Sequence, residues 1–302
     1  MLALESVRIV RYLRTLRGGS QPMLVQASDG FLYVVKFNNN LQGPHLAFNE
    51  SAGSELFRAC GLAVPAWKPL LLTNEMIDRT PGCWMQTVEG VQRPEAGMCF
   101  GSRYLGHSGA RILEILPGTS FSRIRNRASF WMARLIDVCG EHADNRQAIF
   151  VEQATGWLNA FFLDHGHMFG GPSGGIEPRL QTSCYLDSRV YSDISSNDSE
   201  GILRIVRELN ADDLWLRIHA LPDDWKARSA LQGFERCLNR LSNYNMLRNV
   251  MDALVDTHRR RTPISRSRIA DAHEGAPALL HARLPARGRR ARIGWEDYPA
   301  AG

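Results

Sequence analysis

The sequence predicts an α+β protein with two unlike lobes, a β-rich N-lobe followed by a helical C-lobe. Short runs of β-branched and aromatic residues occupy the first third, whereas the second half carries longer runs with helical spacing. The pair Pro117-Gly118 separates the two regions. Strands followed by helices favour two packed layers with a cleft between them. We therefore expect an N-lobe at 1–117, a C-lobe at 118–258 and a tail at 259–302.

The expected N-lobe consists mainly of short strands around one helix. Strands are predicted at 7–14, 23–27, 31–37, 67–72, 98–104 and 111–116. Ser28-Asp29-Gly30 joins the second and third strands and is a hairpin signal. Residues 47–60 have helical spacing and end at Gly61, a natural helix stop. Residues 73–96 are predicted to hold a short helix, a strand around Trp84-Met85-Gln86 and a loop.

The expected C-lobe is helical except for two short apolar strands. Helices are predicted at 120–125, 128–139, 200–209, 211–218 and 227–259, strands at 147–151 and 158–163, and a long surface loop at 171–197. The two strands are close in sequence, so we expect a hairpin-like connection between them.

The net charge of +5 is distributed unevenly. Residues 259–302 contain ten arginines and four acids, a net charge of +6, which leaves −1 for residues 1–258. Such a composition predicts a solvated, disordered tail. Weak contact of the tail with nucleic acid is the alternative.

The remaining composition indicates a globular protein with a packed core, since 44% of its residues are hydrophobic. No run approaches the roughly 18 apolar residues of a membrane span, and the N-terminal segment carries Glu5 and Arg8, unlike a secretory signal. We expect a cytoplasmic protein without membrane contact. The six cysteines are far apart and form no CxxC pair, which predicts reduced core residues.

Two acidic residues lie in loops at the ends of the C-lobe strands. Asp144 precedes the strand 147–151, and Asp164 follows the strand 158–163. Phosphoryl-transfer enzymes need two such carboxylates, one for the attacking hydroxyl and one for Mg²⁺. Acids after strands are also common turn formers. A transition-metal hydrolase that uses these acids with His142 and His165 is a further alternative.

A strand lysine and a glycine loop in the N-lobe favour the phosphate interpretation. Lys36 is one of only three lysines among 36 basic residues, and a lysine suits a phosphate. Its alternative is an outward-facing side chain. A buried lysine needs a carboxylate partner, for which the following helix offers Glu50 or Glu55. The loop Gly18-Gly19-Ser20-Gln21-Pro22 has free amides that could lie over phosphates.

Together these segments resemble the HipA-like kinase family, a branch of the protein-kinase-like fold, over about residues 7–258. The resemblance is carried by Gly19-Ser20-Gln21-Pro22, Tyr33-Val34-Val35-Lys36-Phe37, Asn49-Glu50, Ala59-Cys60-Gly61-Leu62-Ala63-Val64-Pro65, Phe100-Gly101-Ser102-Arg103, Glu114-Ile115-Leu116-Pro117, His142-Ala143-Asp144-Asn145-Arg146-Gln147, Phe162-Leu163-Asp164-His165-Gly166 and Leu221-Pro222-Asp223-Asp224-Trp225. The order of the segments is similar to that of the family, although none is as specific as a complete phosphate-binding loop.

The resemblance implies an ATP-dependent kinase that transfers the γ-phosphoryl group to a Ser/Thr-type hydroxyl of an unidentified protein or small molecule. Its cofactors would be ATP and Mg²⁺. Lys36 would bind the α- and β-phosphates and pair with Glu50, Asp144 would be the catalytic base, and Asp164 would bind the metal. Gly19 and Ser20 would lie near the phosphates, and Glu114 to Leu116 would form the adenine hinge.

The sequence departs from the family pattern at the metal site. A metal-binding asparagine is expected five residues after the catalytic aspartate, and Ile149 occupies that position. Gln147 or Asn145 would have to replace it, since amide oxygens bind Mg²⁺. In addition, His142 stands where relatives often have asparagine. A nucleotide-binding pseudokinase or regulatory module is therefore the alternative function.

Overall fold

The computed structural model describes residues 6–106, 110–174, 184–191 and 193–261. The chain divides into two compact units, residues 1–248 and 249–302. Among the described residues, all the strands and most of the helices belong to the first unit, and the described part of the second unit is the end of one helix. The site described below lies entirely within the first unit.

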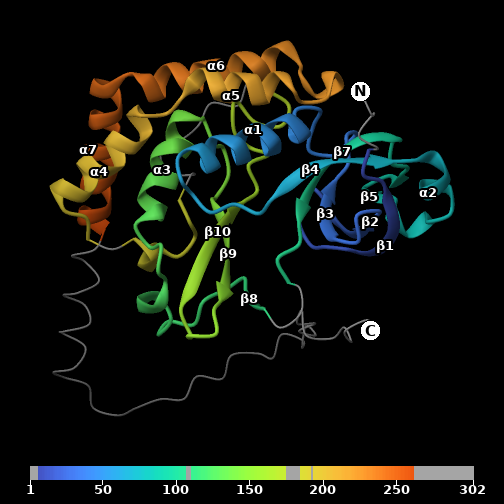
Figure 1. Cartoon of the computed structure of the whole chain (residues 1–302), viewed down its shortest axis with the longest axis horizontal. Coiled ribbons are helices and arrows are strands. Elements are labelled where there is room, and N and C mark those ends of the chain that lie inside the picture. Colours follow the sequence, from blue (N-terminus) through green and yellow to red (C-terminus); the bar gives the residue numbers. More distant parts are fainter. Residues whose placement is uncertain (1–5, 107–109, 175–183, 192, 262–302) are drawn as a thin grey trace. The chain divides into compact units, whose positions relative to one another are not determined.

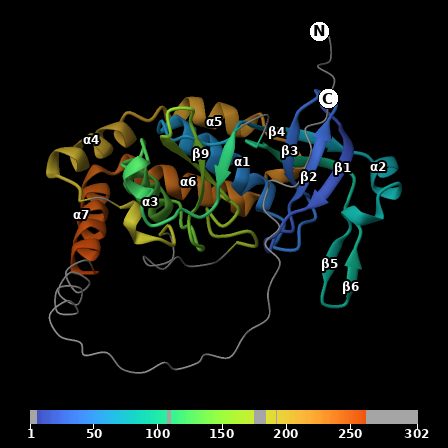
Figure 2. The same cartoon turned by 90° about the horizontal axis from the view of Figure 1, so that it is seen from below.

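The N-terminal part is built on a five-stranded antiparallel sheet. Its strands, in spatial order, are β1 (Ile9–Thr15), β2 (Met23–Ala27), β3 (Leu32–Lys36), β7 (Gly97–Arg103) and β4 (Trp67–Leu72). Alternate side chains along the strands, such as those of Met23, Val25, Tyr33 and Val35, enter one hydrophobic core. A small hairpin of β5 (Met85–Thr87) and β6 (Gly90–Gln92) projects beside this sheet (Figure 2).

Helix α1 (Leu46–Ala59) is the central helix of the first unit. Residues 46–57 are all buried, polar ones included. The helix contacts β7 as well as two later helices, α5 (Ala211–His219) and α6 (Arg228–Ser242), and Figure 1 shows it between the sheet and these helices. A helix buried on all sides presents its polar residues to other protein groups, so Asn49, Glu50 and Glu55 must find partners there.

The following part contains a second antiparallel sheet and most of the helices. Strands β9 (Gln147–Glu152) and β10 (Leu158–Leu163) form a hairpin, and β8 (Arg111–Leu113) pairs with β9. Helix α3 (Ser129–Cys139) precedes the hairpin and α4 (Ser196–Arg207) follows it. Short helical elements complete the unit: α2 (Asn74–Asp78), η1 (Pro81–Cys83), η2 (Phe121–Arg123), η3 (Ser188–Val190) and η4 (Asp223–Trp225).

The long helical region predicted at 227–259 consists of two successive helices. Helix α6 ends at Ser242 and α7 (Tyr244–Arg261) begins two residues later. Asn243 between them has extended dihedral angles, and its side chain accepts a hydrogen bond from Met246 N at 3.1 Å. Asparagine competes for backbone groups in this way and starts a new helix rather than continuing the old one.

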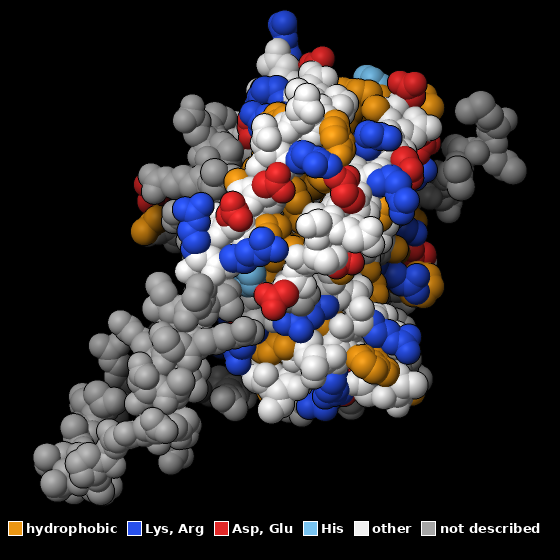
Figure 3. Space-filling model, turned by 90° about the vertical axis from the view of Figure 1, so that its left-hand side faces the viewer, with side chains coloured by type: hydrophobic (Ala, Val, Ile, Leu, Met, Phe, Trp, Pro, Cys, Tyr) orange, Lys and Arg blue, Asp and Glu red, His pale blue; other side chains and the backbone are white. Residues whose placement is uncertain are grey.

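The predicted α+β class, with a β-sheet N-terminal part and a helical C-terminal part, is confirmed. Five of the six cysteines are buried, and all six are unpaired, as predicted. Within the described part of the chain, no helix is both long enough and apolar enough to span a bilayer. Most of the predicted basic tail, residues 262–302, lies outside the described residues. On the face shown in Figure 3, the described positive and negative side chains are interspersed.

Candidate active site

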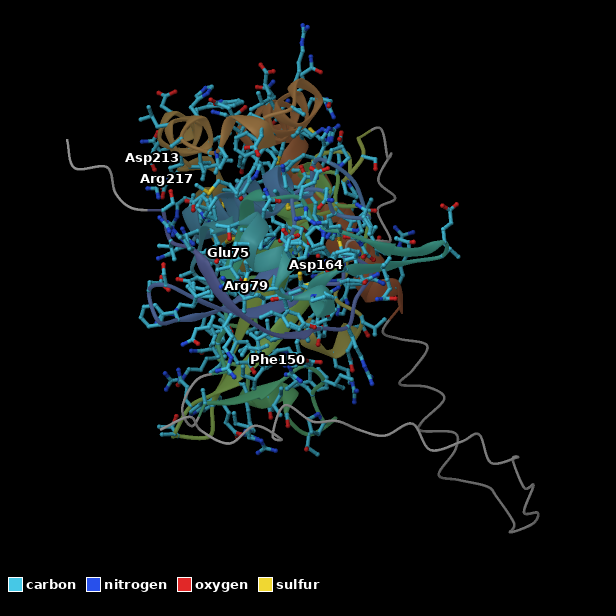
Figure 4. All side chains as sticks on the ribbon, turned by 90° about the vertical axis from the view of Figure 1, so that its right-hand side faces the viewer. Glu75, Arg79, Phe150, Asp164, Asp213 and Arg217 are labelled. Carbon is cyan, nitrogen blue, oxygen red and sulfur yellow. The ribbon has the colours of Figure 1, made fainter. Side chains whose placement is uncertain are left out.

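Lys36, Glu50 and Asp164 form one ion-pair network although they come from distant parts of the chain. Lys36 ends β3, Glu50 lies in α1, and Asp164 directly follows β10. The ammonium of Lys36 contacts Glu50 Oε1 and lies 2.7 Å from Asp164 Oδ1. Three predicted site residues therefore meet at one place within the first unit (Asp164 is labelled in Figure 4).

Glu50 also fixes the backbone of the loop after Asp164. Its carboxylate accepts hydrogen bonds from His165 N at 3.0 Å and from Gly166 N at 3.1 Å. A Cβ atom on Gly166 would lie 3.1 Å from Glu50 Oε1 and would collide with Leu46. Glycine at position 166 therefore allows the loop to approach α1 closely enough for both hydrogen bonds.

The sequence left Glu55 as an alternative partner for Lys36, and the structure gives Glu55 other partners. Its carboxylate lies 2.7 Å from Arg58 NH1, 2.9 Å from Trp67 Nε1 and 3.4 Å from Arg217 NH1. Five residues along an α-helix correspond to about 140° of rotation. Glu50 and Glu55 therefore point to different neighbours even though both are buried.

Lys36 and Asp164 stay charged in the network despite their burial. Burial alone would lower the pKa of Lys36, but the carboxylates of Asp164 and Glu50 outweigh burial and raise it. Burial would raise the pKa of Asp164, but Lys36 outweighs it and holds the pKa well below the usual range. Burial raises the pKa of Glu50, against the opposing charge of Lys36. Lys36 is thus a charged group with three N–H donors, two of which face carboxylates.

Asp164 is held in an uncommon backbone conformation by a buried arginine. Its φ angle is 63°, in the left-handed region. Arg146 NH1 donates to Leu163 O at 2.8 Å and to Asp164 O at 3.3 Å. The same guanidinium pairs with Asp137 of α3 and lies over the ring of Phe57 in α1, 4.7 Å from its centroid. Arg146 therefore positions Asp164 through hydrogen bonds to backbone carbonyls and not through the carboxylate.

Asp144 lies in the loop next to that of Asp164. The β9–β10 register pairs Gln147 with Leu163, so the chain entering β9 and the chain leaving β10 are at the same end of the hairpin. The ring of His142 joins the two loops, with Nδ1 2.7 Å from Asp144 O and Nε2 3.2 Å from Asp164 O. The loop of the half-buried Asp144 therefore lies beside the loop of Asp164, which is part of the Lys36 network.

The predicted metal ligands are Asp164, Asn145 and Gln147. Mg²⁺ in nucleotide sites is typically bound by one or two carboxylates together with phosphate oxygens and waters, and the ionised Asp164 fits this chemistry. Asn145 and Gln147 are exposed, at or just before the start of β9. Ile149, half-buried and paired with Phe161, has an apolar side chain and offers no ligand.

The structure does not support the alternative of a transition-metal hydrolase. Among the residues described, no group of three or more His, Cys, Asp or Glu side chains is arranged to hold a metal ion. His142 faces two backbone carbonyls, as described above. His165 Nδ1 lies 3.3 Å from Arg146 NH1, and its ring packs on Phe57 with a centroid distance of 4.5 Å. Both histidines are thus engaged with protein groups.

The glycine loop between β1 and β2 is held by amide side chains. Ser20 is buried, and its carbonyl accepts a hydrogen bond from Asn40 Nδ2 at 2.8 Å. Gln21, at φ 42°, pairs with the backbone of Gln86 through both amide atoms, at 2.6 and 2.8 Å. Gly19 is exposed in the same loop. The loop is therefore fixed on two sides, which keeps its backbone in a defined place.

The predicted adenine hinge follows β8. The strand ends at Leu113, short of the predicted 116, so Glu114 to Leu116 lie outside it. Glu114 is exposed and Leu116 is buried. Their role in adenine binding stays a prediction.

Sequence reasoning missed the residues that position the acids. Asp137 is an acid within the apolar run of α3, and such a residue predicts a buried cationic partner, here Arg146. That signal was present in the sequence. Asn40, which holds the glycine loop through the carbonyl of Ser20, gave no such signal, because polar residues in a loop are ordinary.

No protein-family model matches this chain, and no curated protein matches it. Among solved structures, the chain is similar to two of the Golgi casein kinase, each at 12% identity. The structure with Mn/ADP bound has a TM-score of 0.44, with 82% of this chain and 73% of that chain covered. The second has a TM-score of 0.45, with 83% and 75% covered. Similarity at this level does not assign an activity.

Proposed function

We propose that this protein transfers the γ-phosphoryl group of ATP to a hydroxyl group of Ser/Thr type, as the resemblance to HipA-like kinases implies. The observation that supports this most directly is the network of Lys36, Glu50 and Asp164, next to the loop of Asp144. Phosphoryl transfer depends mainly on positioning and charge neutralisation, and this arrangement offers groups for both.

In this proposal each residue has one role. The third N–H of Lys36 donates to an α- or β-phosphate oxygen, while Glu50 and Asp164 hold the other two. Asp144 accepts the proton of the attacking hydroxyl. The glycine loop covers the phosphates with its backbone amides. Arg146 and His142 are positioning residues that act through the two acidic loops.

The charge of the network argues for a divalent cation. Lys36 carries one positive charge and Asp164 one negative charge, and Glu50 and Asp144 are two further acids nearby. A polyphosphate would meet a net negative site. Mg²⁺ held by Asp164, with Asn145 or Gln147 as an additional oxygen donor, would supply the neutralising charge.

Nucleotide binding and turnover of the full chain test this proposal. We expect a rise in the melting temperature with ATP and Mg²⁺, and Mg²⁺-dependent formation of ADP. Asp144→Asn should abolish ADP formation while ATP still shifts the melting temperature, and Lys36→Ala should weaken the shift itself. Asp223→Asn, at an exposed acid of η4, is the control. Turnover that survives Asp144→Asn would remove Asp144 from the mechanism.

The alternative is a nucleotide-binding pseudokinase, and Ile149 is the observation that favours it. Kinases of the family use an asparagine for the metal at this position, and isoleucine offers no oxygen. This alternative predicts that ATP shifts the melting temperature without any Mg²⁺-dependent ADP formation. Replacing Ile149 by Asn would then be expected to create turnover, because it restores an amide ligand.

A further inference from the structure

Gln42 extends from the loop between β3 and α1 into the space between the glycine loop and the loop after Asp164. Its Nε2 atom lies 3.2 Å from Nε2 of His167, three residues after Asp164. On the other side, a Cβ atom on Gly19 would lie 3.1 Å from the same Gln42 atom. One side chain therefore bridges the two loops between which the phosphates of a nucleotide would lie.

The backbone of Gln42 is fixed from two directions. Gln42 N donates to Asn40 Oδ1 at 3.1 Å, and Ser173 Oγ donates to Gln42 O at 3.1 Å. Asn40 in turn holds the carbonyl of Ser20 in the glycine loop. A Cβ atom on Gly43 would collide with Pro172, so the loops are in close contact here. The side chain of Gln42 is thus presented from a rigid support.

The amide of Gln42 has a polar atom without a partner. Its Oε1 is buried and makes no hydrogen bond with any residue that the structure describes. In the exchanged orientation of the amide, Oε1 accepts a hydrogen bond from Nε2 of His167, and the N–H₂ group of Gln42 is the group without a partner. A buried polar group that lacks a partner destabilises the protein, whichever of the two atoms it is. A phosphoryl oxygen accepts hydrogen bonds, so it can satisfy the N–H₂ group in the exchanged orientation but not Oε1.

His167 connects the two acid-bearing loops through its backbone. Its carbonyl accepts a hydrogen bond from Ala143 N at 3.0 Å, and Ala143 is the neighbour of Asp144. Its half-buried ring faces Gln42. The imidazole and the carboxamide are both N–H donors, whereas the neighbouring Asp144 and Asp164 are acceptors when ionised. An anionic group that enters this region would need donors of this kind.

We propose that Gln42 and His167 together bind the terminal phosphoryl group of the nucleotide. Gln42 donates to a phosphoryl oxygen from its unpartnered N–H₂ group, and His167 donates from Nε2 in place of its contact with Gln42. This inference rests on the proposed function and names the residues that distinguish a nucleoside triphosphate from a diphosphate. Gln42 and His167 would also donate to the phosphoryl oxygens that gain negative charge during transfer.

Calorimetric titration of the full chain with ATP and with ADP, each with Mg²⁺, tests the inference. Gln42→Leu and His167→Leu should each weaken ATP binding about tenfold or more, as expected for a hydrogen bond to a charged group, and should leave ADP binding nearly unchanged. Gln42→Glu, similar in size but anionic, should weaken ATP binding further. Gln153→Leu, in the β9–β10 turn at the far end of the hairpin from Asp164, is the control.

Other outcomes would overturn the inference. Equal losses for ATP and ADP would mean that the two residues only support the fold, and a thermal denaturation curve for each variant would show this directly. Tighter ATP binding in the variants would mean that the Gln42–His167 contact blocks the site. If the unchanged protein binds neither nucleotide, the proposed function fails together with this inference. If it binds ATP and the variants keep its preference for ATP, only this inference fails.

Discussion

Arg146 and Asp137 form an ion pair in the interior of the protein, with Arg146 Nε 2.9 Å from Asp137 Oδ2 and side-chain exposures of 1% and 0%. The pair matters for the candidate site because the same guanidinium donates to the carbonyl of Leu163, next to Asp164. It thus connects α3 to the loop that carries the predicted metal ligand.

Asp137→Asn is expected to destabilise the protein by about 3–5 kcal/mol, because it leaves the buried Arg146 charge without its counter-ion. Urea denaturation monitored by circular dichroism gives the free energy of unfolding. Asp213→Asn is the control, since Asp213 pairs with the exposed Arg217 (both labelled in Figure 4) and should matter far less. Equal effects of the two substitutions would contradict the assigned importance of the buried pair.

Glu50→Gln is expected to lower nucleotide turnover about a hundredfold, because Lys36 and the backbone at His165 lose the carboxylate that holds them. Glu55→Gln is the matched control. Glu55 lies on the same helix and is also buried, but it contacts Arg58 and Trp67 instead of Lys36. Rates of ADP formation at saturating ATP decide between them. A comparable loss of ADP formation in both variants would show that turnover depends on the integrity of α1 and not on the ion pair of Glu50 with Lys36.

Gly53→Ala is expected to destabilise the protein by about 1–3 kcal/mol, although alanine favours a helix more than glycine does. The reason is that a Cβ atom at position 53 would lie 2.8 Å from Cγ of His165 and 3.0 Å from Sδ of Met168. Gly201→Ala in α4 is the control, because a Cβ atom there meets nothing within 4 Å. That substitution should stabilise the protein by about 0.5–1 kcal/mol. Thermal melts compare the two, and stabilisation by both would contradict the close packing of α1 against the loop after Asp164.

The free energy of unfolding is expected to fall as the pH drops from 7 to 5 in the absence of nucleotide and metal. Burial, with Arg146 adding to it, lowers the pKa of both His142 and His165. Below about pH 6.5 the unfolded chain takes up protons that these folded histidines do not, so the unfolded state gains stability.

The slope of that pH dependence is up to about 1.4 kcal/mol per pH unit for each histidine. His142→Gln and His165→Leu should each reduce it, whatever they do to the stability at pH 7. Urea denaturation at several pH values measures the slope. An unchanged slope in both variants would show that these histidines take up protons in the folded protein as readily as in the unfolded one.

Much of the local structure followed from the sequence. The strands β2, β4 and β10 begin and end at the predicted residues, because each is a short, mainly apolar run that is recognisable locally. Lys36, Asp144 and Asp164 were identifiable since a lone lysine on a strand and acids at strand ends are local features. The break between α6 and α7 was missed because Asn243 acts through its own dihedral angles and not through hydrophobic spacing.

The sequence by itself determined the order of strands and helices and the residue types available for chemistry. Only the tertiary structure decided which of them meet. Glu50 rather than Glu55 pairs with Lys36 because the rotation of α1 is set by burial on all its sides. Lys36 meets Asp164, 128 residues away along the chain, and Gln42 meets His167, 125 residues away. Contacts at such separations depend on the packing of whole elements, which local side-chain preferences do not specify.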